Sequence, residues 1–327
     1  MRRFGKWLGR VLLGLAVALA AVWFLWPREP VDTEITFDPR VLPENLDVYL
    51  EQTEARYDDI SNGVQKRIIW AGEPGEQTDL SVIYVHGFSA TSEEIRPVPD
   101  LIAKELGANL FYSRLRGHGR SGLAMAEPSA GDWVEDMAEA LAVGRRLGKE
   151  VVVLSTSTGG TIAAVAAKNP ELRKAVKGIV FISPNFRIKS PTATILEWPL
   201  ARTISTLLAG AERSFDPQNE GHAKYWTTIY PTTALIPMAA IVRHARKADY
   251  ADVPTPALFV FSDDDAVVDA ETTRAVSTKW GGSVTLAPRV MGPEDDPFNH
   301  VIAGDILSPD QTAETAELIV NWVEGLP

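Results

Sequence analysis

The sequence predicts an α/β fold in which a mostly parallel sheet is covered by helices on both faces. Short apolar runs, typical of buried parallel strands, alternate with amphipathic helical patterns between residues 80 and 182. The spacing between successive runs is that of strand–helix–strand units. The alternation stops between about residues 184 and 254, and then resumes with two more strands and a final helix.

The individual elements follow from two patterns. Strands are the short apolar runs, and helices are segments in which apolar residues recur on one side. In the segment 131–147, for example, Trp133, Met137 and Leu141 recur in this way. We expect strands at 64–72, 80–85, 109–112, 151–154, 178–182, 257–261 and 283–288, and helices at 46–60, 94–106, 131–147, 159–168 and after residue 308.

The final helix has a specific predicted start. Ser308 is expected to be its N-cap, with Pro309 at the first helical position and Gln311 at the third. This is the S-x-x-Q form of the capping box, in which the two polar side chains satisfy free backbone N–H groups.

The chain divides into an anchor, a lead-in and one main domain. Residues 28–63 begin with a proline-rich, acidic stretch and are interpreted as a linker and lead-in to a domain at 64–327. The interval at about 184–254 contains Trp198, Trp226 and Tyr230. We interpret this interval as a helical cap inserted over the carboxyl ends of the strands, where ligands bind in such sheets.

The charge and cysteine content of the 327-residue chain exclude several functions. The formal net charge is −11, and four basic residues, with no acidic residue among them, precede the apolar stretch 11–26. The rest of the chain is therefore more acidic still, and such a domain repels nucleic acid. No cysteine is present, which excludes disulfides, thiolate catalysis and cysteine-ligated metals. The four basic residues are Arg2, Arg3, Lys6 and Arg10.

Residues 1–27 are interpreted as a membrane anchor. The stretch 11–26 has no charge and no proline, and with residues 7–10 it approaches the ~20 residues that span a bilayer. Trp23 and Trp26 suit the far interface, and Pro27 ends the helix. The basic flank predicts a cytoplasmic N-terminus and a main domain on the outer side, periplasmic or extracellular.

A cleaved signal peptide is the alternative interpretation of the same segment. Ala18-Leu19-Ala20 fits an A-x-A cleavage site, and cleavage there would give a secreted protein. The bulky stretch 22–26 lies beyond that site, where a mature terminus is usually polar. We therefore favour the anchor.

The strongest local signal is the stretch 151–160, VVVLSTSTGG. An apolar strand runs into a turn around Ser157 and then into a helix of small residues. This is the G-x-S-x-G pattern with Ser155 in place of the first glycine. Such a turn pushes the serine Oγ out over the sheet edge, and the helix N-terminus beneath it favours negative charge. Taken alone, the motif also fits an ordinary strand–helix turn with a capping serine.

Four further motifs, like the serine turn, lie at the ends of predicted strands. Residues 85–88 (VHGF) and 114–121 (RLRGHGRS) come early, 261–268 (FSDDDAVV) follows the interval interpreted as a cap, and 298–301 (FNHV) precedes the final helix. Together these motifs resemble the α/β-hydrolase family, and more closely its monoacylglycerol-lipase-like and carboxylesterase-like branch. The resemblance covers roughly residues 64–327.

The resemblance implies specific roles. Ser157 matches the family's nucleophile, Asp265 its acid and His300 its base, in the Ser…Asp…His order of this fold. The backbone N–H groups of Phe88 and Thr158 match the donors of the oxyanion hole.

Other residues compete for the acid and base roles. The family's register is a strand, a small residue, two more residues, the acid, one residue and then Val-Val, and it selects Asp265. The loop before the final helix selects His300. The competing acids are Asp263, Asp264 and Asp269, and the competing histidines are His86, His118, His222 and His244.

The sequence therefore predicts a serine hydrolase that cleaves carboxylic esters through an acyl-enzyme, with no metal or organic cofactor. An aromatic cap and a membrane anchor favour hydrophobic acyl esters, as for a carboxylesterase or a monoacylglycerol-type lipase. The acidic clusters 263–265 and 295–296 could bind a cation but lack a ligand pattern such as the EF-hand loop. The alternatives are a serine-triad thioesterase or peptidase, or a non-catalytic, membrane-tethered binding protein of the same fold.

Overall fold

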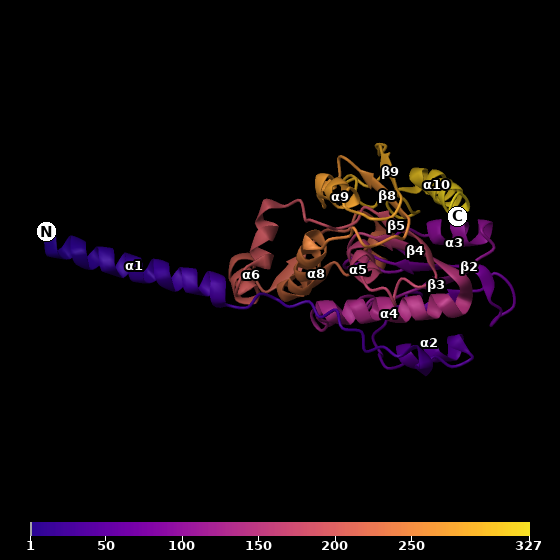
Figure 1. Cartoon of the computed structure of the whole chain (residues 1–327), viewed down its shortest axis with the longest axis horizontal. Helices are drawn as coiled ribbons and strands as arrows, with labels where there is room; N and C mark the ends of the chain where they lie inside the picture. The colour runs from indigo at the N-terminus through magenta and orange to yellow at the C-terminus, as the bar shows by residue number, and fades with distance from the viewer. Residues whose placement is uncertain (1) are drawn as a thin grey trace.

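The computed structural model describes residues 2–327 and is built around a seven-stranded sheet (Figure 1). The strands lie in the order β1-β3-β2-β4-β5-β8-β9. Every neighbouring pair is parallel except β1 and β3, which confirms the predicted mostly parallel sheet. The strands are β1 (Arg67–Ile69), β2 (Thr78–Val85), β3 (Asn109–Tyr112), β4 (Gly148–Thr156), β5 (Val176–Ile182), β8 (Ala257–Ser262) and β9 (Val284–Arg289).

Successive side chains of each central strand enter two different hydrophobic cores. In β4, Val151 and Val153 pack in one core, whereas Val152 and Leu154 pack in the other. Burial of both sheet faces explains why these strands are continuous apolar runs. The first core is closed by α2 (Leu46–Glu54), α4 (Ala130–Leu147), α5 (Thr158–Ala167), α8 (Leu235–Lys247) and α9 (Ala270–Ser277), and the second by α3 (Val98–Glu105) and α10 (Thr312–Glu324).

The predicted capping box at Ser308 is wrong. The Ser308 hydroxyl donates to the Val301 carbonyl (2.5 Å) and accepts the N–H of Asp296 (3.1 Å), so it braces the preceding loop instead of the helix. A 3₁₀ turn, η5 (Pro309–Gln311), comes first, and α10 begins at Thr312.

Three other helices differ from the expectation. Helix α2 ends at Glu54 and not at 60. Helix α3 begins at Val98 and not at 94, with Pro97 and Pro99 around its first turn, where neither proline has an N–H to donate. Helix α9 is not predicted by the sequence pattern, and its N-cap Asp269 accepts the N–H of Glu271 (3.1 Å).

The interval 184–254 leaves the sheet after β5 and returns to it at β8. Its backbone contacts the turn after β2, where Thr227 N–H donates to Ser89 O (2.7 Å), and Lys189 Nζ donates to the Asp265 carbonyl. These contacts place the part of the interval before α8 over the carboxyl ends of the strands. The elements of the interval are η3 (Pro191–Glu197), α6 (Ala201–Ala209), the antiparallel pair β6 (Glu212–Ser214) and β7 (Ile229–Pro231), α7 (Glu220–Tyr225), η4 (Thr232–Ala234) and α8, which packs against α5 in the core.

The lead-in is held against the domain along its length. The Glu29 carboxylate pairs with Arg202 of α6 (3.0 Å), and its carbonyl accepts Arg243 of α8 (2.7 Å). Farther along, the Glu135 carboxylate of α4 accepts the Thr36 hydroxyl and the Phe37 N–H, both at 2.9 Å. This segment is therefore a strap across one side of the domain.

Helix α1 (Arg2–Leu25) projects away from the rest of the chain (Figure 1). Within residues 2–327, its segment Lys6–Leu25 is the one helix that is long and apolar enough to cross a membrane, with mean hydropathy 2.2. At its end, Trp23 lies edge-to-face with Trp198 of the interval 184–254 (5.6 Å between ring centroids), and the Arg28 guanidinium lies over the Trp23 ring.

Candidate active site

Ser157 occupies a strained turn between β4 and α5. Its backbone has φ 49° and ψ −116°, a conformation that non-glycine residues rarely adopt. The turn is held by hydrogen bonds from Ser157 N–H to Ile182 O (2.9 Å) and from Asn185 N–H to Ser157 O (2.9 Å). This is the geometry by which a strand-to-helix turn presents a serine Oγ above the sheet.

His300 and Asp265 complete an unbroken hydrogen-bonded chain with this serine. His300 Nε2 lies 3.0 Å from Ser157 Oγ, and His300 Nδ1 lies 2.8 Å from Asp265 Oδ2. All three side chains are buried. The carboxylate accepts the proton of Nδ1, so in the neutral imidazole Nε2 is free to accept the hydroxyl proton of Ser157.

Backbone donors fix the orientation of the Asp265 carboxylate. Its Oδ1 accepts the N–H groups of Val267 (2.7 Å) and Val268 (2.8 Å), which leaves Oδ2 for His300. On the other side of the pair, Asp296 Oδ2 accepts the N–H groups of His300 (3.1 Å) and Val301 (2.9 Å). Both partners of the hydrogen bond are therefore positioned by their own loops.

The electrostatic surroundings favour a protonated His300. Burial alone would lower the pKa of His300, but the charge and hydrogen bond of Asp265, with the charges of Glu94 and Asp296, raise it above its ordinary value of 6.5. An imidazolium formed at His300 would therefore be stabilised where it stands.

The turn at residues 86–88 follows β2 and lies beside Ser157. A Cβ built on Gly87 would lie only 3.1 Å from Ser157 Cβ. The imidazole of His86 donates through Nδ1 to Gly87 O (2.9 Å) and accepts Leu115 N–H at Nε2 (3.2 Å). Burial lowers the pKa of His86 to about 4, so this neutral tautomer persists at physiological pH.

The contact from His86 orients the amide of Phe88. Gly87 C=O and Phe88 N–H belong to one planar trans peptide and point in opposite directions. By holding the carbonyl, His86 turns the Phe88 N–H the other way. Across residues 2–327, no protein acceptor takes the N–H of Phe88 or of Thr158, which is the first residue of α5. Both amides are therefore free to bind a ligand.

The other candidates from the sequence lie elsewhere. His118 is buried against His86 and Trp133, with its Nδ1 at Arg116 O (3.1 Å), and burial holds its pKa well below the ordinary value. Asp269 caps α9. Of the remaining competitors, Asp263 pairs with Arg274, Asp264 is exposed, and His222 and His244 lie on α7 and α8.

The acidic pair Asp295 and Asp296 organises the loop of His300. Asp295 Oδ2 accepts Gly292 N–H and the Gln311 side chain, both at 2.7 Å, while Asp296 accepts the backbone N–H groups described above. Within the described residues, no three His, Asp or Glu side chains form a group that could hold a metal ion. The role of Asp296 was not predicted, because its partners are backbone amides that have no signature in the sequence.

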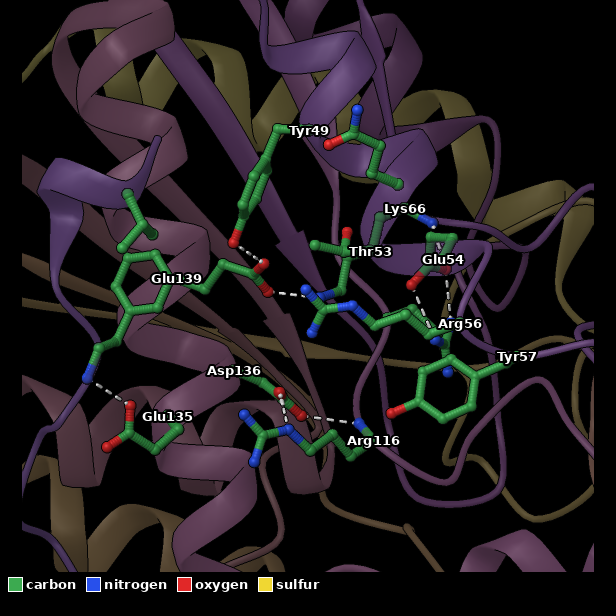
Figure 2. A pocket seen from close by; sticks show the side chains of 14 residues that line it. Tyr49, Thr53, Glu54, Arg56, Tyr57, Lys66, Arg116, Glu135, Asp136 and Glu139 are labelled. Atoms are coloured by element: carbon green, nitrogen blue, oxygen red, sulfur yellow. Dashed lines mark hydrogen bonds and ion pairs between the residues drawn. The ribbon is translucent and has the colours of Figure 1, made fainter. Parts of the chain in front are cut away.

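A polar cavity lies away from this site, between α2, α4 and the segments around Lys66 and Arg114. It encloses about 500 Å³, and Figure 2 shows that charged side chains line it. Glu54 pairs with Arg114 (2.7 Å), and Lys66 pairs with Glu139. The charges of the lining are thus mostly satisfied by one another, and none of the residues of the Ser157 site lines it.

The parallel sheet, the serine turn after β4 and the buried His–Asp pair define an α/β hydrolase. The family model described as "Serine aminopeptidase, S33" (Hydrolase_4) matches residues 76–287. The chain belongs to this family, and it is an enzyme of the lipase- and esterase-like α/β-hydrolase class.

Individual relatives agree with this assignment. The thermostable monoacylglycerol lipase of Bacillus sp. (strain H-257) is 27% identical over 208 residues, which are 62% of this chain and 78% of that protein. Two solved structures share the fold. One comes from work on the metagenome-derived lipolytic enzymes LipS and LipT (TM-score 0.66, 21% identity, 81% of this chain and 99% of that one). The other is the monoacylglycerol lipase of Paleococcus ferrophilus (TM-score 0.57, 15% identity, 79% and 97%).

Proposed function

We propose that the protein hydrolyses carboxylic esters of hydrophobic acyl groups, with Ser157 as nucleophile, His300 as general base and acid, and Asp265 as the group that orients His300. The observation that carries the proposal is the continuous chain of hydrogen bonds from Ser157 Oγ through both nitrogens of His300 to Asp265. An arrangement of nucleophile, base and orienting carboxylate in contact is the requirement for acyl transfer through a covalent intermediate.

In the first half of the reaction, Ser157 Oγ attacks the ester carbonyl carbon while His300 Nε2 takes the hydroxyl proton. The negative charge that develops on the carbonyl oxygen is stabilised by the N–H groups of Phe88 and Thr158. His300 then gives its proton to the leaving alkoxide, and an acyl-serine and an alcohol result.

In the second half, water attacks the acyl-serine while His300 again accepts a proton. Collapse of the second tetrahedral intermediate releases the carboxylic acid and restores the serine hydroxyl. The raised pKa of His300 suits both steps, because the imidazolium must form in each transition state and return its proton to the leaving oxygen.

The surroundings of the site support a hydrophobic acyl group. The ring of Phe88, whose N–H is one of the two proposed oxyanion donors, packs edge-to-face with Tyr230 of β7 (5.4 Å between centroids). Ile229 beside it is exposed, as is Leu123 of η2 (Gly122–Ala126). The relatives described as monoacylglycerol lipases point to the same substrate class, with a glycerol monoester as the most specific form of the proposal.

We also propose that α1 anchors the chain in a membrane with its N-terminus in the cytoplasm. The basic residues that precede the apolar segment support this orientation. Because Trp198 contacts Trp23 near the end of α1, α6 would lie at the depth of the membrane interface. The side chain of Leu207 on α6 is 83% exposed and Leu208 is also exposed, and both would then contact lipid.

The hydrolytic proposal is tested on the full chain in detergent with p-nitrophenyl esters of short, medium and long acyl chains. We expect turnover to vanish in Ser157→Ala and to persist in Ser155→Ala, the matched control two residues away. A fluorophosphonate probe should label the wild type and not Ser157→Ala. Labelling without ester turnover, together with cleavage of aminoacyl p-nitroanilides, would favour a peptidase, as the family description allows. Neither labelling nor turnover would favour the binding protein.

The membrane proposal is tested by site-specific labelling, which the absence of cysteine makes simple. Single variants Phe24→Cys, Leu207→Cys and Val290→Cys carry a polarity-sensitive fluorophore in full-length protein in lipid nanodiscs. We expect the probes at 24 and 207 to be shielded from an aqueous quencher and the probe at 290 to be open to it. Equal quenching at 207 and 290 would contradict the placement of α6 at the membrane interface. A chain recovered without residues 1–20 from cells would identify α1 as a cleaved signal.

A further inference from the structure

A buried carboxyl group, Glu94, lies behind the turn at residues 86–88, and the reaction steps above do not use it. Glu94 sits between β2 and α3 and is only 3% exposed. Its Oε2 accepts the N–H of Gly87 (2.7 Å) and the hydroxyl of Tyr84 (2.9 Å). A buried carboxylate is costly unless its contacts compensate, so its presence beside this turn requires an explanation.

The contacts of Glu94 complete the orientation of the oxyanion turn. Gly87 belongs to two peptide planes: Glu94 holds the N–H of the first, and His86 holds the C=O of the second. Because both peptide planes are fixed, the N–H of Phe88 is held in a single orientation. A side chain at position 87 would displace this carboxylate, because its Cβ would lie 2.6 Å from Glu94 Oε1.

Glu94 is also coupled to His300. The loop that follows His300 packs on the backbone of Glu94, where a Cβ on Gly304 would lie 3.0 Å from Glu94 O. Burial raises the pKa of Glu94 to about 7, and the Gly87 N–H, the Tyr84 hydroxyl and the charge of His300 each oppose that rise. The charge of Glu94 in turn raises the pKa of His300.

The charged and titratable groups around this pair are few. Tyr84 of β2 faces Glu94, and its hydroxyl also contacts Thr156 Oγ1 of β4 (3.1 Å). Asp265, from the loop after β8, and Asp296, from its own loop, face His300. The neighbouring Glu93 turns outward and pairs with Arg67 (2.8 Å), so it takes no part in this network.

We propose that Glu94 is a positioning residue for the ester hydrolysis: it holds the Gly87 amide so that the Phe88 N–H meets the oxyanion, and its charge stabilises the His300 imidazolium. The proposal rests on the proposed function of the Ser157 site. Glu94 is thus given two effects, one through its hydrogen bond to Gly87 and one through its charge, and two substitutions separate them. Glu94→Gln keeps an oxygen acceptor for Gly87 and Tyr84 but removes the charge. Glu94→Asp keeps the charge but shortens the reach to Gly87.

The experiment measures kcat and KM for p-nitrophenyl butyrate against pH in the full chain, for both variants and for the control Glu93→Gln. In Glu94→Gln we expect the acidic limb of kcat/KM to move to lower pH, because His300 loses a charge that favours its protonated form. In Glu94→Asp we expect the limb to stay and kcat to fall by up to about 10²-fold, as for a misplaced oxyanion donor, with KM little changed. Glu93→Gln should match the wild type.

Several results would overturn the inference. One such result is an active wild type whose acidic limb of kcat/KM is unchanged in Glu94→Gln and whose kcat is unchanged in Glu94→Asp. Glu94 would then have neither effect. Equal losses of kcat at all pH values in both variants, with lowered thermal unfolding temperatures, would reduce Glu94 to a structural residue. If the wild type neither hydrolyses esters nor reacts with a fluorophosphonate, the proposed function fails and takes the Glu94 inference with it.

Discussion

Replacing Asp265 by asparagine should abolish most turnover and leave the fold intact. Oδ1 of Asp265 accepts two backbone N–H groups, from Val267 and Val268, while Oδ2 faces His300. An asparagine must keep its carbonyl oxygen on the two backbone donors, because its NH₂ group cannot accept from them. The NH₂ group therefore faces Nδ1 of His300 and forces the tautomer that carries its proton on Nε2.

That tautomer cannot accept the proton of Ser157. The fall in kcat should therefore be as large as that caused by loss of the general base. In serine proteases the corresponding change lowers kcat by about 10⁴-fold. At 1.36 kcal/mol for each factor of ten, this is about 5 kcal/mol of barrier. The free energy of unfolding should change by no more than about 1–2 kcal/mol, because both hydrogen bonds of Oδ1 persist in the variant.

The assay is kcat for p-nitrophenyl butyrate, with urea unfolding as the check on the fold. Asp263→Asn and Asp264→Asn are the matched controls, since Asp263 pairs with Arg274 and Asp264 is exposed. Both controls should turn over near the wild-type rate. A loss in Asp265→Asn of less than about tenfold, or an equal loss in Asp263→Asn, would refute the assignment of the acid and the tautomer argument with it.

Three further predictions follow from other contacts. The kcat/KM of the wild type should rise with pH, and the midpoint of this rise should lie above pH 6.5, because only neutral His300 accepts the serine proton and the pKa of His300 is raised. A midpoint below pH 6.5 would contradict the electrostatic argument. Gly159→Ala should lower the free energy of unfolding by about 1–3 kcal/mol or more, since its Cβ would lie 2.2 Å from a backbone carbonyl of β2; an unchanged urea midpoint would show that α5 can shift freely. Arg114→Met should cost about 3–5 kcal/mol by leaving the buried Glu54 carboxylate unpaired, whereas Lys149→Met, at an exposed pair, should cost at most about 1 kcal/mol.

The sheet could be predicted from the sequence, and so could the meeting of Ser157, Asp265 and His300 at one edge of the sheet. Buried parallel strands are apolar on both faces, so runs such as 80–85 and 151–154 stand out in the sequence, and they are strands in the structure. Parallel strands end at one edge, so loops after β4 and β8 meet there, and the loop before the final helix joins them. The distances from His300 to Ser157 and Asp265 follow this geometry, while the chemical roles stay predictions until the variants are measured.

The roles of Ser308 and Glu94 could not be predicted from the sequence, because both side chains bind backbone groups. Ser308 lies at the expected position before a helix, but its hydroxyl is taken by Val301 O and Asp296 N–H. Glu94 has no motif because its partners, Gly87 N–H and Tyr84 OH, are defined only once β2 and its turn are folded. A side chain that recognises a backbone amide leaves no pattern of residue types, so such roles are visible only in three dimensions.

Ser155 shows which glycine of the serine motif this fold requires. Ser155 lies within β4, is fully buried, and donates through its Oγ to Val180 O of β5 (2.9 Å), so a side chain is accommodated at this position. At Gly159, by contrast, a Cβ would lie 2.2 Å from Val85 O and 2.7 Å from His86 O. The steric limit on the turn is therefore the close approach of α5 to the end of β2. That approach brings the first turn of α5 against the end of β2 and His86, and a small polar residue two positions before Ser157 is compatible with it.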